Sequence, residues 1–321
     1  FTMRTNKQLV LIFGGSGFIG THLVEELIKN NYEIVIADIN RPKYQSAAEF
    51  QFCDVREEIM LDLPKLPNLI INLAAVHRTP GHAETEYFDT NINGALNITA
   101  WCNLKEIKHI FFVSSIAVYG SGNEIKTEHS HPTPESAYGR SKLIAEKIHE
   151  LWFEKDPYER NLYICRPAVI FGKGERGNFT RLANALRKNR FVYPGINTTI
   201  KASGYVKDLV RSILFVIKHG ENYELYNFAF PLKYTLNDVC VAFSDVSNFR
   251  KPLSLPINKF IDLLNHVPGP AKNLGIRIQK LRQQTIVEPQ RLKEMEFNWE
   301  FDLKSAISDW NKSNSKEHFY E

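Results

Sequence analysis

A short apolar segment followed by three evenly spaced glycines constrains this chain more than any other part of its sequence. Residues 9–13 read Leu-Val-Leu-Ile-Phe, and Gly14, Gly17 and Gly20 then lead into a helical pattern over residues 19–30. In a strand, turn and helix of this type, the first glycine permits a sharp turn, the second lets the backbone approach a pyrophosphate, and the third allows close helix packing. The N–H groups at the helix N-terminus attract an anion. The segment therefore predicts a dinucleotide site, against the alternative of a purely structural turn.

A second strand pattern ends in an acid at the distance that such a site requires. Residues 33–38 read Glu-Ile-Val-Ile-Ala-Asp, and Asp38 follows Gly20 by 18 residues. A carboxylate there binds the 2′-hydroxyl of the cofactor ribose. Arg41 is near in sequence and would suit a 2′-phosphate, but Asp38 would repel that group. We therefore expect NAD rather than NADP as the cofactor.

Composition excludes several classes of protein. The 321 residues are 43% apolar and 24% charged, which is enough to bury a large core. A formal net charge of +4 is too small to indicate nucleic-acid binding. The four cysteines lack CxxC spacing and fall in apolar patterns, so we interpret them as buried residues in a reducing compartment and expect no metal site. No apolar run approaches the roughly 18 residues of a membrane span, and no signal peptide opens the chain, so we expect a cytoplasmic protein.

Strand and helix patterns alternate over the first two thirds of the chain. After residue 38 the strand patterns cover 49–56, 68–75, 109–115 and 162–171, and the helical patterns between them cover 85–105 and 135–155. This alternation predicts right-handed crossovers and a doubly wound parallel sheet of the α/β class. Ligands of such sheets bind at the carboxyl ends of the strands.

The regular alternation ends near Phe171. Further helical patterns follow at 179–188, at 206–218, near Leu236 and near Pro256. We expect residues 1–171 to form a dinucleotide-binding domain and residues 172–321 to form mainly a smaller C-terminal substrate lobe. Elements at about 200–230 should return to the main sheet.

One predicted helix carries a tyrosine and a lysine on the same face. Tyr138 and Lys142 are four residues apart, and Ser136 before them is a suitable N-cap. A tyrosine with its ordinary pKa of about 10 is a poor base at neutral pH. The Lys142 ammonium and the positive nicotinamide ring of an oxidised cofactor would both lower the pKa of Tyr138, which makes this tyrosine a candidate general base. Taken alone, the same spacing also fits a chance pair with a solvated lysine.

A serine at the end of a buried strand pattern supports the catalytic interpretation. Ser115 follows the strand pattern at 109–115 and precedes Tyr138 by 23 residues, so it emerges at the same sheet edge as the glycine turn. Its hydroxyl would hydrogen-bond the alcohol that is oxidised and hold it near Tyr138. The alternative is a serine that only forms a turn at the strand end.

Eight short motifs, taken in chain order, resemble those of the extended short-chain dehydrogenases/reductases. They are Gly14-x-x-Gly17-x-x-Gly20, Asp54-Val-Arg56, Asn72-Leu-Ala-Ala75, Asn91-x-Asn-Gly94, Ser115-Ile-Ala-Val-Tyr-Gly120, Tyr138-Gly-Arg-Ser-Lys142, Arg166-Pro167 and Tyr205-Val-Lys-Asp208. The match covers nearly all of the chain and is similar to the nucleotide-sugar epimerase and dehydratase branch. The resemblance implies a Rossmann-type fold and a homodimer whose interface pairs the helices at 85–105 and 135–155 of each copy.

The resemblance also implies a role for each motif residue. Tyr138 would be the base, Lys142 its electrostatic partner and a ribose ligand, and Ser115 the third catalytic group, in contact with substrate. The implied cofactor-binding residues are Gly14, Gly17, Phe18, Ile19, Gly20, Asp38, Asp54, Val55, Leu73, Ala74, Ala75 and Asn91, together with Tyr138 and Lys142. Within this set, Asp38 would hold the adenosine ribose, and Asp54 and Val55 the adenine.

Departures from the family pattern limit which of the family's reactions the resemblance implies. Ala117 stands where many relatives have a Ser or Thr that contacts the sugar, and Asn72 replaces a frequent His. Dehydratases of this branch carry an Asp-Glu pair just after the catalytic serine, whereas this chain has Ile116 and Ala117 there. The resemblance therefore implies NAD-dependent epimerisation at C4 of a diphosphate-linked sugar through a 4-keto intermediate, in surface-polysaccharide synthesis. The alternatives are an NAD(P)H-dependent 4-keto-sugar reductase and a dinucleotide-sensing regulator without catalysis.

Two short segments fall where relatives hold a nucleoside diphosphate. They contribute Arg176, Asn178 and Lys201 as candidate substrate ligands. Asn178 would bond diphosphate oxygens, Lys201 would supply positive charge, and Arg176 is near in sequence. The alternative is that all three are ordinary solvated side chains. His77 and Arg78 are further candidates to face phosphate.

Several segments are also similar to bacterial enzymes that epimerise N-acetylglucosamine on undecaprenyl diphosphate. These segments cover residues 74–78, 159–162, 164–172 and 175–178. A membrane-bound substrate requires an interfacial approach, so we expect a peripheral membrane contact at residues 272–293, which mix basic and apolar side chains. The basic ones are Arg277, Lys280, Arg282 and Arg291. The alternative is a basic helix packed on the lobe.

Overall fold

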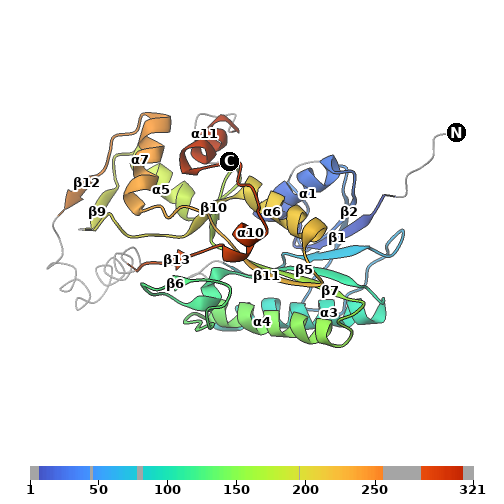
Figure 1. The fold of residues 1–321 in the computed structure, drawn as a ribbon. Helices are drawn as coiled ribbons and strands as arrows, with labels where there is room; N and C mark the ends of the chain where they lie inside the picture. Colours follow the sequence, from blue (N-terminus) through green and yellow to red (C-terminus); the bar gives the residue numbers. More distant parts are fainter. Residues whose placement is uncertain (1–6, 44–45, 78–81, 195, 256–282, 314–321) are drawn as a thin grey trace.

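The computed structural model describes residues 7–43, 46–77, 82–194, 196–255 and 283–313, and its centre is one seven-stranded sheet (Figure 1). The strands lie in the order β3-β2-β1-β4-β5-β7-β11, and every neighbouring pair is parallel. Their bounds are β1 (Leu9–Phe13), β2 (Glu33–Asp38), β3 (Glu49–Phe52), β4 (Leu69–Asn72), β5 (His109–Val113), β7 (Asn161–Pro167) and β11 (Tyr223–Phe228). The predicted doubly wound parallel α/β sheet is confirmed.

The central strand β1 shows why both faces of the sheet are covered. All five of its residues are buried, and they alternate between two apolar cores. Val10 and Ile12 pack with one pair of helices, and the other three residues pack with a second pair on the opposite side (Figure 1). The pairs are α1 (Phe18–Lys29) with α6 (Val206–His219), and α3 (Gly94–Leu104) with α4 (Ala137–Glu154). A continuous apolar run is what a strand with two covered faces requires.

The helix predicted over residues 85–105 contains a wider turn. α2 (Glu84–Phe88) leads into a π-helical segment (Asp89–Asn93), which continues as α3. A π-helical turn inserts a residue into a helix and is frequent at functional sites. Asn91 lies in this segment, and its side chain is buried against α4.

The chain from β8 (Val169–Phe171) onward builds a third core, which is rich in aromatic residues. Phe171 stacks on Phe179 with ring centroids 4.2 Å apart, and Trp310 lies 5.8 Å from Phe171. The helices around this core are α5 (Asn178–Arg187), α7 (Leu236–Ser247) and α11 (Leu303–Ser313). Three two-stranded parallel sheets complete the chain: β8 with β10 (Ser203–Tyr205), β9 (Val192–Pro194) with β12 (Leu253–Leu255), and β6 (Ile125–Lys126) with β13 (Ile286–Val287).

Part of the C-terminal half lies on the main sheet. β11 pairs with β7 along its whole length, and α6 packs in the same core as α1. The short helix α10 (Gln290–Glu294) adds the buried Leu292 to that core. The two lobes therefore share elements, and the border near residue 171 stays a prediction.

Several smaller expectations have clear outcomes. The strand predicted over 49–56 ends at Phe52, so Asp54 and Val55 lie in the following loop. The helix expected near Pro256 lies outside the described residues. All four cysteines are buried free thiols, as predicted. Among the described helices, none combines the length and the apolarity that a membrane crossing needs. Within the same part of the chain, no group of three His, Cys, Asp or Glu side chains is placed to hold a metal ion.

Candidate active site

The three glycines of the turn after β1 have different steric surroundings. Gly14 has φ +76°, and a Cβ there would lie 2.6 Å from the Ala74 backbone nitrogen, so only glycine fits beside the end of β4. A Cβ on Gly20 would collide with the Gly15 carbonyl, where α1 packs on the turn. A Cβ on Gly17 would meet only the Gly14 oxygen, at an ordinary 3.4 Å. Gly17 therefore faces open space, where a pyrophosphate would approach the N-terminus of α1.

Asp38 ends β2 with its carboxylate beside this turn. Its Oδ2 accepts a hydrogen bond from the Ser16 N–H at 3.1 Å, and its Oδ1 accepts one from the Asn40 N–H at 2.9 Å. Arg41 does not pair with this acid, because its guanidinium lies over the Phe50 ring, 4.9 Å from the centroid. A fixed carboxylate suits the hydroxyls of a ribose and repels a 2′-phosphate, so the residues present fit NAD.

The first two residues of α1 face different neighbours. Phe18 packs against the aromatic core of the C-terminal half, with its ring edge-on to His22 at 5.6 Å. His22 shares a 2.8 Å hydrogen bond with the Lys173 carbonyl, which ties α1 to the loop before α5. Ile19 packs against the core that α1 and α6 form on one face of the sheet. These contacts place Phe18 between the glycine turn and the predicted substrate lobe.

The predicted adenine residues differ in their surroundings. Asp54 binds Arg56, with Oδ2 to Nη2 at 2.5 Å, and this hydrogen bond holds the pKa of the Asp54 carboxyl below its ordinary value. Val55 is buried, and a Cβ on Gly94 would lie 2.8 Å from its Cγ2, so Val55 supports the start of α3. Its carbonyl accepts a 2.9 Å hydrogen bond from Asn97.

The chain after β4 is held in place by two buried asparagines. Leu73, Ala74 and Ala75 are half-buried there, at the carboxyl edge of the sheet. Asn72 accepts a 3.1 Å hydrogen bond from the Ala74 N–H. Asn91, 3% exposed, accepts from the Val76 N–H at 2.9 Å and donates to its carbonyl and to Ser141 Oγ. Asn91 therefore positions this strand end against α4 through protein contacts.

Ser115 and Tyr138 meet where β5 and α4 converge. Ser115 lies two residues after the end of β5 and caps a 3₁₀ turn (Ile116–Tyr119), accepting a 3.1 Å hydrogen bond from the Ala117 N–H. The Ser115 hydroxyl lies beside the Tyr138 phenol; burial raises the pKa of this phenol, and Ser115 opposes that change. A Cβ on Gly139 would collide with the Ala117 carbonyl, so a glycine is required to bring α4 this close. Sequence reasoning missed this role of Gly139, although the glycine stands between Tyr138 and Lys142.

Burial and neighbouring groups both influence the pKa of Tyr138. Burial is the largest influence and raises the pKa of the phenol above its ordinary value, and the neighbouring Tyr87, 6.2 Å away between ring centroids, raises it further. Without a cofactor, burial sets the direction of this change, and the lowering expected from Lys142 together with NAD⁺ stays a prediction. The phenol becomes an effective base only with added positive charge near its oxygen.

Lys142 is buried in an unusual position for a lysine, with 2% of its surface exposed. Burial lowers the pKa of its ammonium to about 7, and the charge of Glu146 opposes this change. The Nζ lies 4.3 Å from the centroid of the Phe112 ring. His149 stacks on the other side of this cluster, 4.2 Å from Phe112, and burial lowers its pKa to about 4, so it is neutral.

A row of polar side chains continues from Lys142 into the core. Glu146 accepts two hydrogen bonds from Arg166, at 2.9 and 2.6 Å, and both residues are buried. Arg166 also donates to the Tyr119 hydroxyl at 2.8 Å, which donates to Asn227 at 2.9 Å. We call Lys142, Glu146, Arg166 and Tyr119 the buried polar row. Sequence reasoning missed Glu146, although it continues the four-residue spacing of Tyr138 and Lys142.

The predicted substrate residues lie in the C-terminal half. Arg176 is exposed in the loop before α5. Asn178 is the first residue of α5, is exposed, and accepts a 2.9 Å hydrogen bond from Arg181. Lys201 donates a hydrogen bond to the Gln283 carbonyl, and burial lowers the pKa of its ammonium to about 8.

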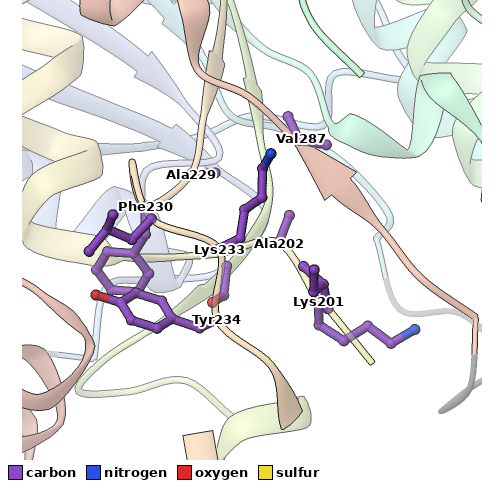
Figure 2. Close-up of a pocket in the computed structure, with 10 residues that line it drawn as sticks. Lys201, Ala202, Ala229, Phe230, Lys233, Tyr234 and Val287 are labelled. Carbon is purple, nitrogen blue, oxygen red and sulfur yellow. The ribbon is translucent and has the colours of Figure 1, made fainter. Parts of the chain in front are cut away.

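Figure 2 shows a small pocket beside Lys201, between the ends of β10 and β11 and the strand β13. Lys201, Lys233 and Tyr234 are among the residues that line it. Ala202 and Ala229, which also line it, pack with Ile116 from the turn that follows Ser115. The lining of this pocket therefore contacts the Ser115 turn, but it does not include Tyr138 or Lys142.

The predicted membrane segment is described only from residue 283. Arg291 there is bound to Glu224 by two hydrogen bonds of 2.8 and 2.7 Å, so it is not free to meet a headgroup. This favours the alternative of a packed segment for the described part. Arg78 and the other three basic residues of the prediction lie outside the described residues. His77 is exposed just after the strand end at β4.

The comparisons with known proteins agree with this geometry. A family model described as the NAD dependent epimerase/dehydratase family matches residues 10–229. The chain belongs to this family. The family depends on NAD, for which the glycine turn and Asp38 form a suitable site.

Curated relatives and solved structures extend the match over the rest of the chain. An Escherichia coli O157:H7 protein, N-acetyl-alpha-D-glucosaminyl-diphospho-ditrans,octacis-undecaprenol 4-epimerase, is 30% identical over 93% of this chain and 92% of its own length. A Vibrio cholerae UDP-glucose 4-epimerase is 28% identical over 67% and 68%. The structure of a Bacillus cereus UDP-N-acetylglucosamine 4-epimerase has a TM-score of 0.76 at 17% identity, covering 98% of this chain and all of that one. At this identity the structure shows the shared fold.

Proposed function

We propose that this protein catalyses NAD-dependent epimerisation at C4 of a sugar joined to a diphosphate. The observation that carries the proposal is the placement of the Ser115 hydroxyl beside the Tyr138 phenol and the buried Lys142, at the same sheet edge as the glycine turn. Family membership and the 4-epimerase names of the relatives support the reaction type. A regulator without catalysis would not need a buried lysine four residues after a tyrosine at this edge.

In this proposal Tyr138 removes the proton of the sugar 4-hydroxyl, and Ser115 holds that hydroxyl by a hydrogen bond. Bound NAD⁺ supplies the hydride acceptor and a positive charge near the phenol. Lys142 is held over Phe112 on the same side of α4, and its protonated form would lower the energy of the phenolate. The 4-keto sugar would then turn over, so that the hydride would come back to the opposite face of C4, and Tyr138 returns the proton to the C4 oxygen.

We further propose Arg176, Asn178 and Lys201 as ligands of the substrate diphosphate. Asn178 opens α5, whose first N–H groups favour an anion. The relative that is similar over 93% of this chain acts, by its name, on a sugar linked to undecaprenol diphosphate, so we place a polyprenyl-diphosphate-linked N-acetylhexosamine first and a UDP-sugar second. This assignment places the protein in surface-polysaccharide synthesis at the cytoplasmic face of the cell membrane.

The test uses both carriers and no added reductant. UDP-N-acetylglucosamine and its polyprenyl-diphosphate counterpart are each incubated with the purified protein, and gluco and galacto products are separated. The proposal predicts interconversion without net consumption of NAD. Reduction of a separately supplied 4-keto sugar with stoichiometric loss of NADH, without interconversion of the gluco and galacto forms, would favour a 4-keto-sugar reductase. No product from either carrier would contradict the assignment.

We also propose a homodimer through α3 and α4. These neighbouring helices expose apolar residues at repeats of eight and seven residues, Leu96 with Leu104 and Ile144 with Leu151. Such spacing places each pair on one side of its helix, and apolar side chains of this size favour burial in an interface. Light scattering should give twice the monomer mass for the native protein and a monomer for Leu104→Asp with Leu151→Asp. An unchanged mass for the double variant would exclude this interface.

A further inference from the structure

We propose that the paired strands β9 and β12, at the end of the C-terminal half remote from the main sheet, bind an anionic lipid surface (Figure 1). The two strands are 61 residues apart in sequence, and Val192 lies directly opposite Leu253. Both side chains point outward, with 40% and 60% of their surfaces exposed. An exposed apolar pair on a small parallel ribbon offers a place for shallow insertion between headgroups.

Basic residues flank this apolar pair on both chain segments. Arg187, Lys188 and Arg190 precede β9, and Arg250 and Lys251 precede β12; all five are exposed. Residues 186–194 and 248–255 contain no Asp or Glu. We call Val192, Leu253 and these five cations the basic strand pair. The net charge of the whole chain is only +4, so these five neighbouring cations make this surface much more positive than the chain as a whole.

The combination of charge and apolar exposure favours a lipid surface over a nucleic acid. Cations near an anionic membrane each contribute about a fivefold gain in binding. Nucleic-acid sites use the same charges but add exposed aromatic rings for stacking. The exposed apolar residues beside these cations are Val192 and Leu253, whereas Phe191 and Phe249 are half-buried against the aromatic core. The basic strand pair thus has the chemistry of an interfacial anchor.

The position of the strand pair relative to α5 connects it with the proposed substrate. α5 has ten residues, so Arg187 at its end lies about 14 Å along the helix from Asn178 at its start. A sugar diphosphate held at Asn178 would then have its lipid tail on the side of the docked membrane. This connection rests on the proposed function, whereas the docking itself depends only on the basic strand pair.

Sedimentation with vesicles tests the proposal without catalysis. Phosphatidylcholine vesicles with and without phosphatidylglycerol are mixed with the full chain at low salt. The native protein should sediment only with the anionic vesicles, and Arg250→Gln with Lys251→Gln should lower the partition coefficient about 30-fold. A matched control, Lys155→Gln with Lys218→Gln, removes two exposed charges elsewhere and should leave the coefficient unchanged.

A second pair of variants separates apolar insertion from charge. Val192→Ser with Leu253→Ser should weaken binding even in high salt, where the charge contribution is screened. Equal melting temperatures by circular dichroism would show that these exposed changes leave the fold intact. Native protein that stays in the supernatant, an Arg250 and Lys251 variant that binds as well as native, or binding to a single-stranded oligonucleotide but not to vesicles would each overturn the proposal.

The failure of docking and the failure of the proposed function give different results. Tyr138→Phe should lose epimerisation and still sediment with anionic vesicles. The Arg250 and Lys251 variant should convert a UDP-linked sugar at the native rate. Epimerisation by a protein that never binds vesicles would refute only the docking, and vesicle binding by a protein without any epimerase activity would refute only the reaction.

Discussion

The charged side chains at the centre of α4 are buried, whereas those of the basic strand pair are exposed. On α4, Lys142 and Glu146 are buried, and Glu146 is bound by Arg166 through two short hydrogen bonds. On β9 and β12, the cations are exposed and stand beside exposed apolar residues. Buried charges require fixed partners and therefore preorganise a site, whereas exposed charges cost little and are available to a large anionic surface. The comparison predicts large effects for changes on α4 and small effects on folding for changes in the lobe.

The largest effect should follow from removing the phenol oxygen. Tyr138→Phe should lower kcat by about 10³-fold, because general base catalysis typically contributes factors of this order. NAD binding, followed by fluorescence quenching, should remain. Tyr87→Phe is the matched control, since its ring lies 6.2 Å from Tyr138 without carrying the base. If both variants lose activity equally, Tyr138 has no special role.

Breaking the buried polar row should be the next largest effect. Glu146→Gln leaves the Arg166 guanidinium buried without its ionic partner and should lower the free energy of unfolding by about 3 kcal/mol in urea titrations. Glu154→Gln, an exposed change on the same helix, should have almost no effect. Glu146→Leu with Arg166→Met should recover much of the loss, because it removes both charges. If Glu146→Gln lowered the free energy of unfolding no more than Glu154→Gln does, the buried polar row would have no structural role.

The buried lysine should leave a signature in the pH dependence of stability. Its folded pKa of about 7 lies below the ordinary 10.5, so between these values the unfolded chain binds the proton and the folded chain does not. The free energy of unfolding should then rise with pH in this window, by about 2 kcal/mol between pH 7 and 9 from this group. Lys142→Met should remove that contribution. Parallel curves for native protein and Lys142→Met would show that the ammonium is not buried as described.

The smallest effect is expected at the exposed substrate residue. Asn178→Ala should raise KM about fivefold, because the substrate would lose one hydrogen bond to its anionic group. The free energy of unfolding should change little, since Asn178 is exposed. Steady-state assays and a urea titration measure the two quantities. If Asn178→Ala lowered the free energy of unfolding more than Glu146→Gln does, the expected difference between α4 and the lobe would be wrong.

Local spacing explains what the sequence predicted correctly. The sharp turn at Gly14, the close helix packing at Gly20 and the parallel sheet follow from turn geometry and from apolar runs, which are read within about thirty residues. Glu146 was missed because its partner Arg166 is 20 residues away and on another element. The rise in the Tyr138 pKa by burial was not predicted, because the charge of a neighbour is visible in a sequence and the depth of burial is not. The pairing of β9 with β12 joins residues 61 apart, which no local pattern contains.

The most direct measurement follows a deuterium atom at C4 of the substrate. A sugar labelled at this carbon, on the UDP or the polyprenyl carrier, is converted by the purified protein, and the product is analysed by mass spectrometry. The account predicts that the label stays at C4 of the epimerised sugar, because hydride leaves and returns within one active site. Loss of the label to solvent or to free NADH, with an epimerised product, would contradict it.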